Sequence, residues 1–208
     1  MIPSPLSELD DPMKRRNFLQ GAAIGAPLIA GGQAWANKLE VHRKLALGYD
    51  NFAVRAMKWK APALIDYAAR LKCDTLFITD FGPFEKMDDS YLKDLRKKGE
   101  DAGVKILLGS WSICPTSKKF RDTWGTADEH LQLGIRAAKA LGSPAFRVVL
   151  GAREDRRTEG GIEARIADTV KVLKRNRTRC LDAGIRIAME NHAGDMHTLE
   201  LRSLIEEA

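Results

Sequence analysis

The feature that most constrains the fold is a strand-then-helix unit that repeats five times along the chain. Short apolar runs begin near residues 45, 74, 104, 145 and 185, and a segment with helical apolar spacing follows each of them. Gly103 and Gly184 stand where two of these helices are expected to end, just before the next strand. Repeated strand–helix units of this length predict a parallel sheet covered by helices.

The boundaries of the expected elements follow from apolar spacing and from turn residues. We expect strands at 45–49, 73–79, 104–108, 145–150 and from 185, and helices at 61–71, 89–102, 126–141, 161–183 and from 197 or 198. A long loop is expected at 109–125. Asp89 or Ser90 is expected to cap the second helix.

The pattern within the strands distinguishes a closed barrel from an open doubly wound sheet. One face of the first, third, fourth and fifth strands is apolar, as at Leu47, Leu108 and Val148, whereas the other face carries small or polar residues. This asymmetry suits a barrel whose interior opens into a polar mouth. No glycine-rich dinucleotide motif and no Walker-type phosphate loop occurs, which disfavours a nucleotide-binding open sheet. The predicted fold class is therefore α/β, a (β/α)8 TIM barrel with about five βα units present.

Chain length limits how much of such a barrel can be present. A complete (β/α)8 barrel typically has about 250 residues, whereas 172 of the 208 residues follow position 36. We therefore expect a barrel that is truncated at its C-terminus, with open strand edges that favour association into oligomers. A short open α/β domain is the alternative.

The fifth strand carries the strongest functional signal. Within the run 185–194, Glu190 is the last residue on the inner face, and Asn191 and His192 follow it at once. Chemistry in α/β barrels sits at the carboxyl ends of the strands, where a carboxylate and an imidazole can hold a metal or move a proton. A capped turn before the next helix is the alternative. Arg147 also points inward, and we expect it to pair with a buried carboxylate rather than with a substrate phosphate.

The first 36 residues have the anatomy of an export signal. Arg15 and Arg16 precede Phe18 and a weakly apolar stretch at 21–32, and the run 34–36 reads Ala-Trp-Ala, a small-x-small cleavage pattern. This order resembles the twin-arginine signal of bacteria. It implies a protein exported to the periplasm or beyond by the twin-arginine machinery, with a barrel domain at 37–208. A membrane contact is expected only if the signal stays uncleaved, and a disordered tail is the alternative.

Charge and cysteine content exclude some classes of function. The formal net charge is +6 and the pI is about 9.3, which would help an anionic substrate to approach. The basic residues are scattered without a dense block of interleaved aromatics, so we expect no nucleic-acid partner. The spacing of Cys73, Cys114 and Cys180 matches no zinc motif, and they are expected to be free thiols.

Three stretches together resemble the xylose isomerase-like TIM barrels, a superfamily that includes sugar phosphate isomerases and epimerases. They are the strand-five run 189–192, the strand-four run 146–151 and the loop 112–117. The resemblance implies that Glu190 binds a divalent metal, Mn²⁺, Mg²⁺ or Zn²⁺, and that it can also move a proton between substrate carbons. The other usual ligands in that superfamily are an Asp, a His and a second Glu from strands six to eight, which lie beyond the five units seen here.

The expected function is that of a metal-dependent isomerase or epimerase of a sugar or sugar phosphate, acting through an enediolate. Glu190 would be a metal ligand and a catalytic base, and His192 would contact a substrate oxygen or orient Glu190. Asn191, Trp111 and Asp50 are the candidate substrate-binding residues. The alternatives are a metal-dependent lyase or hydrolase of oxidised sugars and a non-catalytic sugar-binding relative. An abasic-site endonuclease is less favoured, because it needs several histidines and the chain has four in all.

Overall fold

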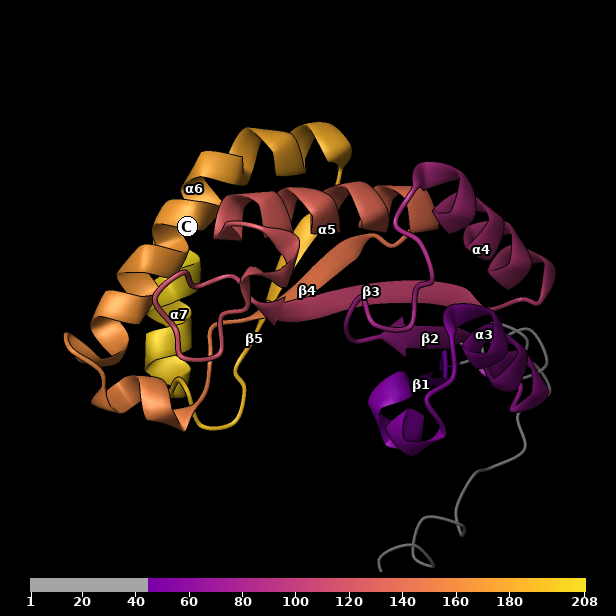
Figure 1. Ribbon diagram of the computed structural model, residues 1–208, viewed down its shortest axis with the longest axis horizontal. Coiled ribbons are helices and arrows are strands. Elements are labelled where there is room, and N and C mark those ends of the chain that lie inside the picture. The colour runs from indigo at the N-terminus through magenta and orange to yellow at the C-terminus, as the bar shows by residue number, and fades with distance from the viewer. Residues whose placement is uncertain (1–44) are drawn as a thin grey trace, which may run out of the picture. The chain divides into compact units, whose positions relative to one another are not determined.

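The fold of residues 45–208 is described by a computed structural model (Figure 1). The export signal expected at 1–36 and the first residues of the expected barrel domain lie outside these described residues. None of the helices in the described range is long and apolar enough to cross a membrane.

Five parallel strands form one sheet in which spatial order follows chain order. Each strand pairs with the next, from β1 to β5, with no crossover to a distant strand. The strands are β1 (Gly48–Asp50), β2 (Thr75–Ile78), β3 (Lys105–Ser112), β4 (Ala145–Val149) and β5 (Arg186–Glu190). A doubly wound sheet reverses its order at a switch point, whereas a barrel keeps one direction, so this order confirms the expected barrel-type α/β arrangement.

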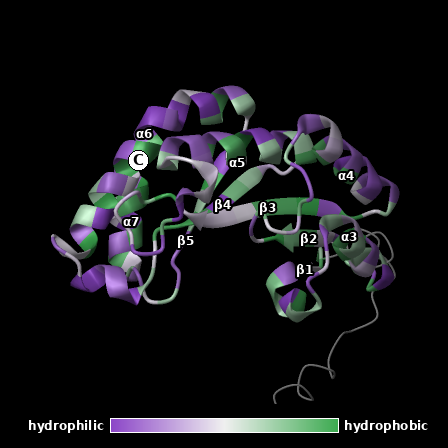
Figure 2. Ribbon diagram, in the orientation of Figure 1, coloured by the Kyte–Doolittle hydropathy of each residue, from purple (hydrophilic) through white to green (hydrophobic). Residues whose placement is uncertain are grey.

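The helices follow the strands as the sequence predicts. They are α3 (Ala61–Arg70), α4 (Asp89–Asp101), α5 (Ala127–Leu141), α6 (Gly161–Ala183) and α7 (Thr198–Glu207), with 3₁₀ turns η2 (Asn51–Met57), η3 (Asp122–Trp124) and η4 (Arg153–Arg157). Helices α4 and α5 lie side by side along one face of β3 and β4 (Figure 1). Their hydrophilic residues alternate with hydrophobic ones, as expected for helices with one face on the sheet (Figure 2).

Local signals set the helix ends. At the start of α5, the Glu129 backbone N–H donates to the Thr126 hydroxyl and the Thr126 backbone N–H donates to the Glu129 carboxylate, which completes a capping box. Gly142 and Gly184 end α5 and α6 in the left-handed region, at φ 73° and 68°. Glycine adopts this conformation without a Cβ penalty, which is why these ends were predictable.

The cap of α4 differs from the expectation. Asp88, and neither Asp89 nor Ser90, has the extended N-cap conformation, and its side chain accepts a hydrogen bond from the Tyr91 N–H at 2.9 Å. Ser90 donates its hydroxyl to the Asp88 carboxylate at 2.6 Å, and Asp89 is already helical. Asp88 is the correct cap because an N-cap carboxylate bonds the N–H two or three residues further on.

The main core lies between the sheet and helices α3, α4 and α5, and a second cluster of buried residues lies by α6 and α7. The outer face of β3 and β4 is buried, as expected, and Phe146 is fully buried. A Cβ placed on Gly134 in α5 would lie 2.1 Å from the Phe146 ring, so only glycine lets this helix approach the sheet so closely.

The expectation for the first strand is wrong in two respects. The strand begins at Gly48, and the side chains of Leu45 and Leu47 are 79% and 61% exposed rather than packed under helices. The strand pairs with β2 over three residues, from Gly48 opposite Thr75 onward, so the two leucines precede the paired residues.

The third strand is longer than predicted. It runs to Ser112, four residues into the expected loop, with a register shift against β4 between Gly109 and Ser112. Ser110 and Ser112 are buried on its outer face, and the Ser112 hydroxyl donates to the Leu150 carbonyl. Polar residues suggested a loop, but buried serines with hydrogen-bond partners fit a strand.

Candidate functional site

The carboxyl ends of the strands surround a cavity of about 210 Å³, here called the strand-end cavity. Its polar and aromatic lining comes from all five strands or from the residues just after them. The lining residues include Asp50, Asp80, Trp111, Arg147, Glu190 and His192. Four of the five residues predicted for the site, all but Asn191, therefore meet in one place.

An ion pair joins two neighbouring strands inside this cavity. Arg147 Nε on β4 lies 3.1 Å from Glu190 Oε2 on β5, and Arg147 Nη1 donates to the Ser110 carbonyl at 2.7 Å. The Arg147 side chain is 17% exposed and that of Glu190 is 44% exposed. The expected pairing of Arg147 with a carboxylate is confirmed, although this carboxylate is half-exposed rather than buried.

Two opposing effects act on the pKa of Arg147. Burial lowers the pKa of the guanidinium, while the nearby carboxylates of Glu190, Asp50 and Asp80 act in the opposite direction. The guanidinium also lies over the Phe77 ring, with Cζ 5.0 Å from the ring centroid.

Gly109 makes room for this guanidinium. A Cβ at this position would lie 2.9 Å from the Phe77 ring and 3.1 Å from Arg147 Nε. Glycine on the inner face of β3 is therefore required by the close approach of Arg147, and its backbone conformation is an ordinary one.

His192 is held in one orientation by two hydrogen bonds. Its Nδ1 lies 3.0 Å from the Gly151 carbonyl, and its backbone N–H donates to the Asp195 carboxylate at 2.8 Å. A carbonyl only accepts, so Nδ1 carries the proton in this contact. The Trp111 ring meets the imidazole edge-on, with centroids 5.6 Å apart.

The other predicted residues have mixed outcomes. The Asn191 side chain donates to the Met196 carbonyl at 2.8 Å, which is the turn-fixing role, and it is not part of the cavity lining. Asp50 lines the cavity and also caps η2 by accepting from the Phe52 N–H at 2.5 Å. Trp111 lies inside β3 rather than after it.

Sequence reasoning missed a fully buried carboxylate in the loop after β4. Asp155 accepts hydrogen bonds from the Ser117 hydroxyl, the Lys118 N–H and the Ala152 N–H, at 2.8–2.9 Å. Asp155 therefore joins the loops after β3 and β4. In the sequence it stands in a run of charged residues, next to the exposed Glu154, and no local pattern marks it as buried.

A second missed carboxylate does the same for the loop after β5. Asp195 is fully buried and accepts from the Gly151, His192 and Met196 N–H groups at 2.6–3.1 Å. An aspartate that follows a turn glycine such as Gly194 is a local signal for side-chain to backbone bonding, although it does not reveal the partner at Gly151.

A second cavity, of about 440 Å³, adjoins the first and is here called the loop cavity. It shares Trp111 and His192 with the strand-end cavity. Its charged lining comes from the loop after β3 and from η4, and consists of Lys119, Arg121, Arg153 and Glu154. None of these four residues was singled out from the sequence as part of a site.

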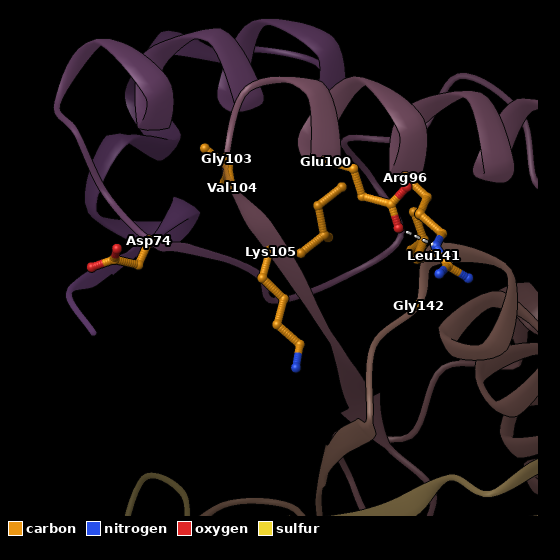
Figure 3. A pocket seen from close by; sticks show the side chains of 9 residues that line it. Asp74, Arg96, Glu100, Gly103, Val104, Lys105, Leu141 and Gly142 are labelled. Carbon is orange, nitrogen blue, oxygen red and sulfur yellow. Dashed lines mark hydrogen bonds and ion pairs between the residues drawn. The ribbon is translucent and has the colours of Figure 1, made fainter. Parts of the chain in front are cut away.

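Another cavity, of about 400 Å³, lies at the opposite end of the strands (Figure 3). Arg96 and Glu100 of α4 form an ion pair at 2.7 Å beside it, and Asp74 and Lys105 contribute one charge of each sign. Its charges therefore balance. The amino-terminal end of barrel strands is generally concerned with stability rather than with chemistry.

The described residues do not by themselves form a metal centre. Across residues 45–208 no group of three or more histidine, cysteine, aspartate or glutamate side chains is placed to hold an ion. Glu190, the expected ligand, is instead engaged by a guanidinium. Its role as a metal ligand stays a prediction.

Comparison with known proteins shows the fold. No protein family and no curated protein matches this sequence. Similar solved structures include a xylose isomerase domain protein from Planctomyces limnophilus, with 15% identity and a TM-score of 0.56 over 78% of this chain and 59% of that one. D-psicose 3-epimerase, solved in the presence of D-fructose, has 16% identity and a TM-score of 0.57, with 78% of this chain and 60% of that one covered.

A third structure is that of the IOLI protein with a bound zinc atom, at 14% identity and a TM-score of 0.58, covering 78% of this chain and 58% of that one. The likeness to these structures shows the fold, an α/β arrangement of the TIM-barrel kind. The chain spans about 60% of the length of the structures that it matches.

Proposed function

We propose that the protein isomerises or epimerises a sugar or sugar phosphate by moving a proton between a carbon atom and Glu190. The observation that carries the proposal is the position of Glu190: its carboxylate lies at the end of β5, in the strand-end cavity, 3.1 Å from a cationic guanidinium. The fold that the chain shares with D-psicose 3-epimerase supports the same choice of chemistry.

The proposed reaction uses Glu190 as the base. The carboxylate removes a proton from the carbon beside the substrate carbonyl, and the electrons of the C–H bond move toward the carbonyl oxygen to form an enediolate. The neighbouring guanidinium of Arg147 stabilises the negative charge that develops. Return of the proton from Glu190 to the adjacent carbon, with transfer of the hydroxyl proton from the first oxygen to the former carbonyl oxygen, completes an isomerisation. An epimerisation instead needs a second acid, which donates a proton to the opposite face of the same carbon.

His192 and Trp111 form the wall on which we propose that the sugar binds. The Nε2 atom of His192 forms a hydrogen bond with a sugar hydroxyl, since its Nδ1 is committed to the Gly151 carbonyl. The Trp111 ring offers a flat apolar face to the C–H groups of the sugar.

We also propose that the site binds a divalent cation. The IOLI protein has a bound zinc atom, and Mn²⁺, Mg²⁺ or Zn²⁺ would polarise the substrate carbonyl when bound. Glu190 is the residue that we expect to bind the ion. The described residues do not complete such a site, so every step above is assigned to protein groups.

Hydrogen exchange tests the proposal directly. D-fructose and D-psicose are incubated in D₂O with the full chain, and deuterium incorporation at carbon is followed by NMR. Glu190→Gln should abolish incorporation, whereas Glu206→Gln, an exposed carboxylate paired with Arg202 on α7, should leave it unchanged. Exchange that persists in Glu190→Gln would exclude Glu190 as the base. Metal content, measured by mass spectrometry on the same samples, tests the ligand role separately.

The loop cavity keeps one alternative open. Its excess of cationic side chains also suits an oxidised sugar, on which a lyase or a hydrolase would act. Such an enzyme would release a shortened or dehydrated product, so the same NMR spectra distinguish elimination from exchange. A non-catalytic sugar-binding protein would show binding without either change.

A further inference from the structure

We propose that the loop cavity is an anion subsite, which binds a phosphate or carboxylate substituent of the same carbohydrate whose carbonyl end lies in the strand-end cavity. This inference rests on the proposed function and deepens it, because it specifies the substrate as an anionic sugar.

The two adjoining cavities carry opposite charge. The loop cavity has a net charge of +2, because it is lined by three cationic side chains and one carboxylate: Lys119, Arg121, Arg153 and Glu154. The strand-end cavity has a net charge of −2, because it is lined by three carboxylates and one guanidinium: Asp50, Asp80, Glu190 and Arg147.

The shared wall fixes the direction of binding. Trp111 and His192 line both cavities, so one ligand can reach both along this wall. A substrate with a neutral polyol end and an anionic end would therefore bind in one direction, because its anion is attracted to the loop cavity and repelled from the strand-end cavity.

The cations of the loop cavity are only lightly neutralised within the described residues. Lys119 Nζ lies 3.9 Å from Glu154 Oε2, a long contact between two half-exposed side chains. Arg121 stacks over the Trp111 ring, with Cζ 5.0 Å from the centroid, which orients its guanidinium without cancelling its charge.

Hydrogen bonds hold the backbone segments that carry Lys119 and Arg153. The Lys119 N–H donates to the Ser117 hydroxyl at 3.0 Å, and that hydroxyl donates to the fully buried Asp155 at 2.9 Å. The Arg153 N–H donates to the Ala193 carbonyl at 3.1 Å, which ties η4 to the turn after β5. Subsite geometry is thus set in the folded chain, and pre-organised charges bind more strongly than flexible ones.

The test compares three ketoses that differ only at carbon 6: D-fructose, D-fructose 6-phosphate and D-fructuronate. Affinities for the full chain are measured by calorimetry at low salt and at 0.15 M salt. We expect at least one anionic ketose to bind about 10-fold more tightly than D-fructose, with a smaller advantage at the higher salt. If only D-fructose 6-phosphate binds tightly, the substrate is a sugar phosphate, and if only D-fructuronate does, it is a sugar acid. Tight binding of both ketoses indicates a subsite for anions in general.

The decisive variant is Arg121→Gln/Arg153→Gln. It should bring the affinities for the anionic ketoses to within about twofold of the affinity for D-fructose measured on the same variant. Arg96→Gln/Arg202→Gln removes the same charge from exposed helical ion pairs and should preserve the preference. Equal binding of all three ketoses by the wild type, or a preference that survives in Arg121→Gln/Arg153→Gln, would overturn the inference.

The outcome for the subsite is separable from the outcome for the proposed function. Deuterium exchange that depends on Glu190, without any preference for anionic ketoses, rejects the subsite and keeps the isomerase or epimerase proposal. A preference that depends on Arg121 and Arg153, without exchange of any ketose, keeps the subsite and rejects that proposal.

Discussion

Arg147 and Glu190 face each other across adjacent strands, with Arg147 Nε 3.1 Å from Glu190 Oε2. The register places Arg147 opposite Ala188, two residues before Glu190, so the guanidinium reaches diagonally toward the end of β5. Its second anchor, the Ser110 carbonyl of β3, lies on the other side. One side chain thus connects three strands beneath the strand-end cavity.

We first predict that Arg147→Gln lowers deuterium exchange into a reactive ketose by about 100-fold or more, because the charge that stabilises the enediolate is lost. Arg147→Lys should recover part of the rate, since it keeps the charge without the planar fork. The measurement is the NMR exchange rate per folded molecule, with the folded fraction taken from circular dichroism. Wild-type exchange in Arg147→Gln would remove Arg147 from the mechanism.

Alanine substitutions at two glycines distinguish an effect on the geometry of the site from an effect on packing in the core. Gly109→Ala introduces a Cβ that would meet the Phe77 ring and the Arg147 guanidinium, so we predict a fall in exchange rate. Gly134→Ala forces a Cβ against the Phe146 ring, and should lower the free energy of unfolding by about 1–3 kcal/mol with little effect on exchange per folded molecule. Urea denaturation measures the free energy of unfolding of both variants, and NMR measures their exchange rates. Equal effects of the two substitutions on the exchange rate per folded molecule would contradict the prediction.

Much of the fold was predictable because local signals agree with it. The five strand–helix units, the parallel order and the buried outer face of β3 and β4 follow from apolar spacing. The position of Glu190 at a strand end followed from the same alternation, because a period of two places every second side chain on one face.

The remainder of the site depends on partners that are distant in sequence. Asp155 is buried because its acceptors are satisfied by backbone N–H groups and by Ser117, 38 residues away. No sequence pattern near Asp155 indicates that Ser117 is its partner. The hydroxyl of Ser110 can similarly be buried in β3 because it forms a hydrogen bond with His130, 20 residues away.

Export is predicted from residues that lie outside the described range. A reporter fused after residues 1–36 should cross the bacterial inner membrane, because the paired arginines Arg15 and Arg16 precede an apolar stretch and an Ala-x-Ala pattern. Changing both arginines to lysine should stop transport by the twin-arginine route. Unimpaired transport of the lysine variant through that route would reject the signal.

The acid dependence of stability is predicted to involve Glu200. Arg156 holds this carboxylate with two hydrogen bonds of 2.7 and 2.8 Å, and this lowers the pKa of Glu200 to about 2. The folded pKa is below the usual value of 4.5, so the stabilisation is complete above about pH 4.5 and is lost as the pH falls through about 2.

Glu200→Gln should therefore lower the free energy of unfolding by about 1–3 kcal/mol at pH 7, and the difference from wild type should vanish near pH 2. Urea titrations across this range provide the measurement. Glu206→Gln, on the exposed pair with Arg202, should change stability by about 0.5 kcal/mol or less. A difference for Glu200→Gln that does not depend on pH would contradict the assignment.

His130 should control stability in a higher pH window. The imidazole is 2% exposed, its Nε2 lies 2.7 Å from the Ser110 hydroxyl, and burial lowers its pKa to about 4. Unfolding returns the pKa to about 6.5, so between these values the unfolded chain binds a proton that the folded chain does not. Stability should thus be highest above pH 6.5, fall by about 1.4 kcal/mol per pH unit toward pH 4, and lose nothing further from this group below that.

The check compares the pH dependence of unfolding in wild type and in His130→Gln between pH 7.5 and 4.5. The variant should be less stable at pH 7.5, because the glutamine replaces a packed ring beside Phe81, but its stability should decline less steeply on acidification. An imidazole NMR titration of the folded wild type should show His130 neutral down to about pH 4. Protonation of the folded imidazole near pH 6.5, or equal slopes in the two proteins, would show that burial does not keep this ring neutral.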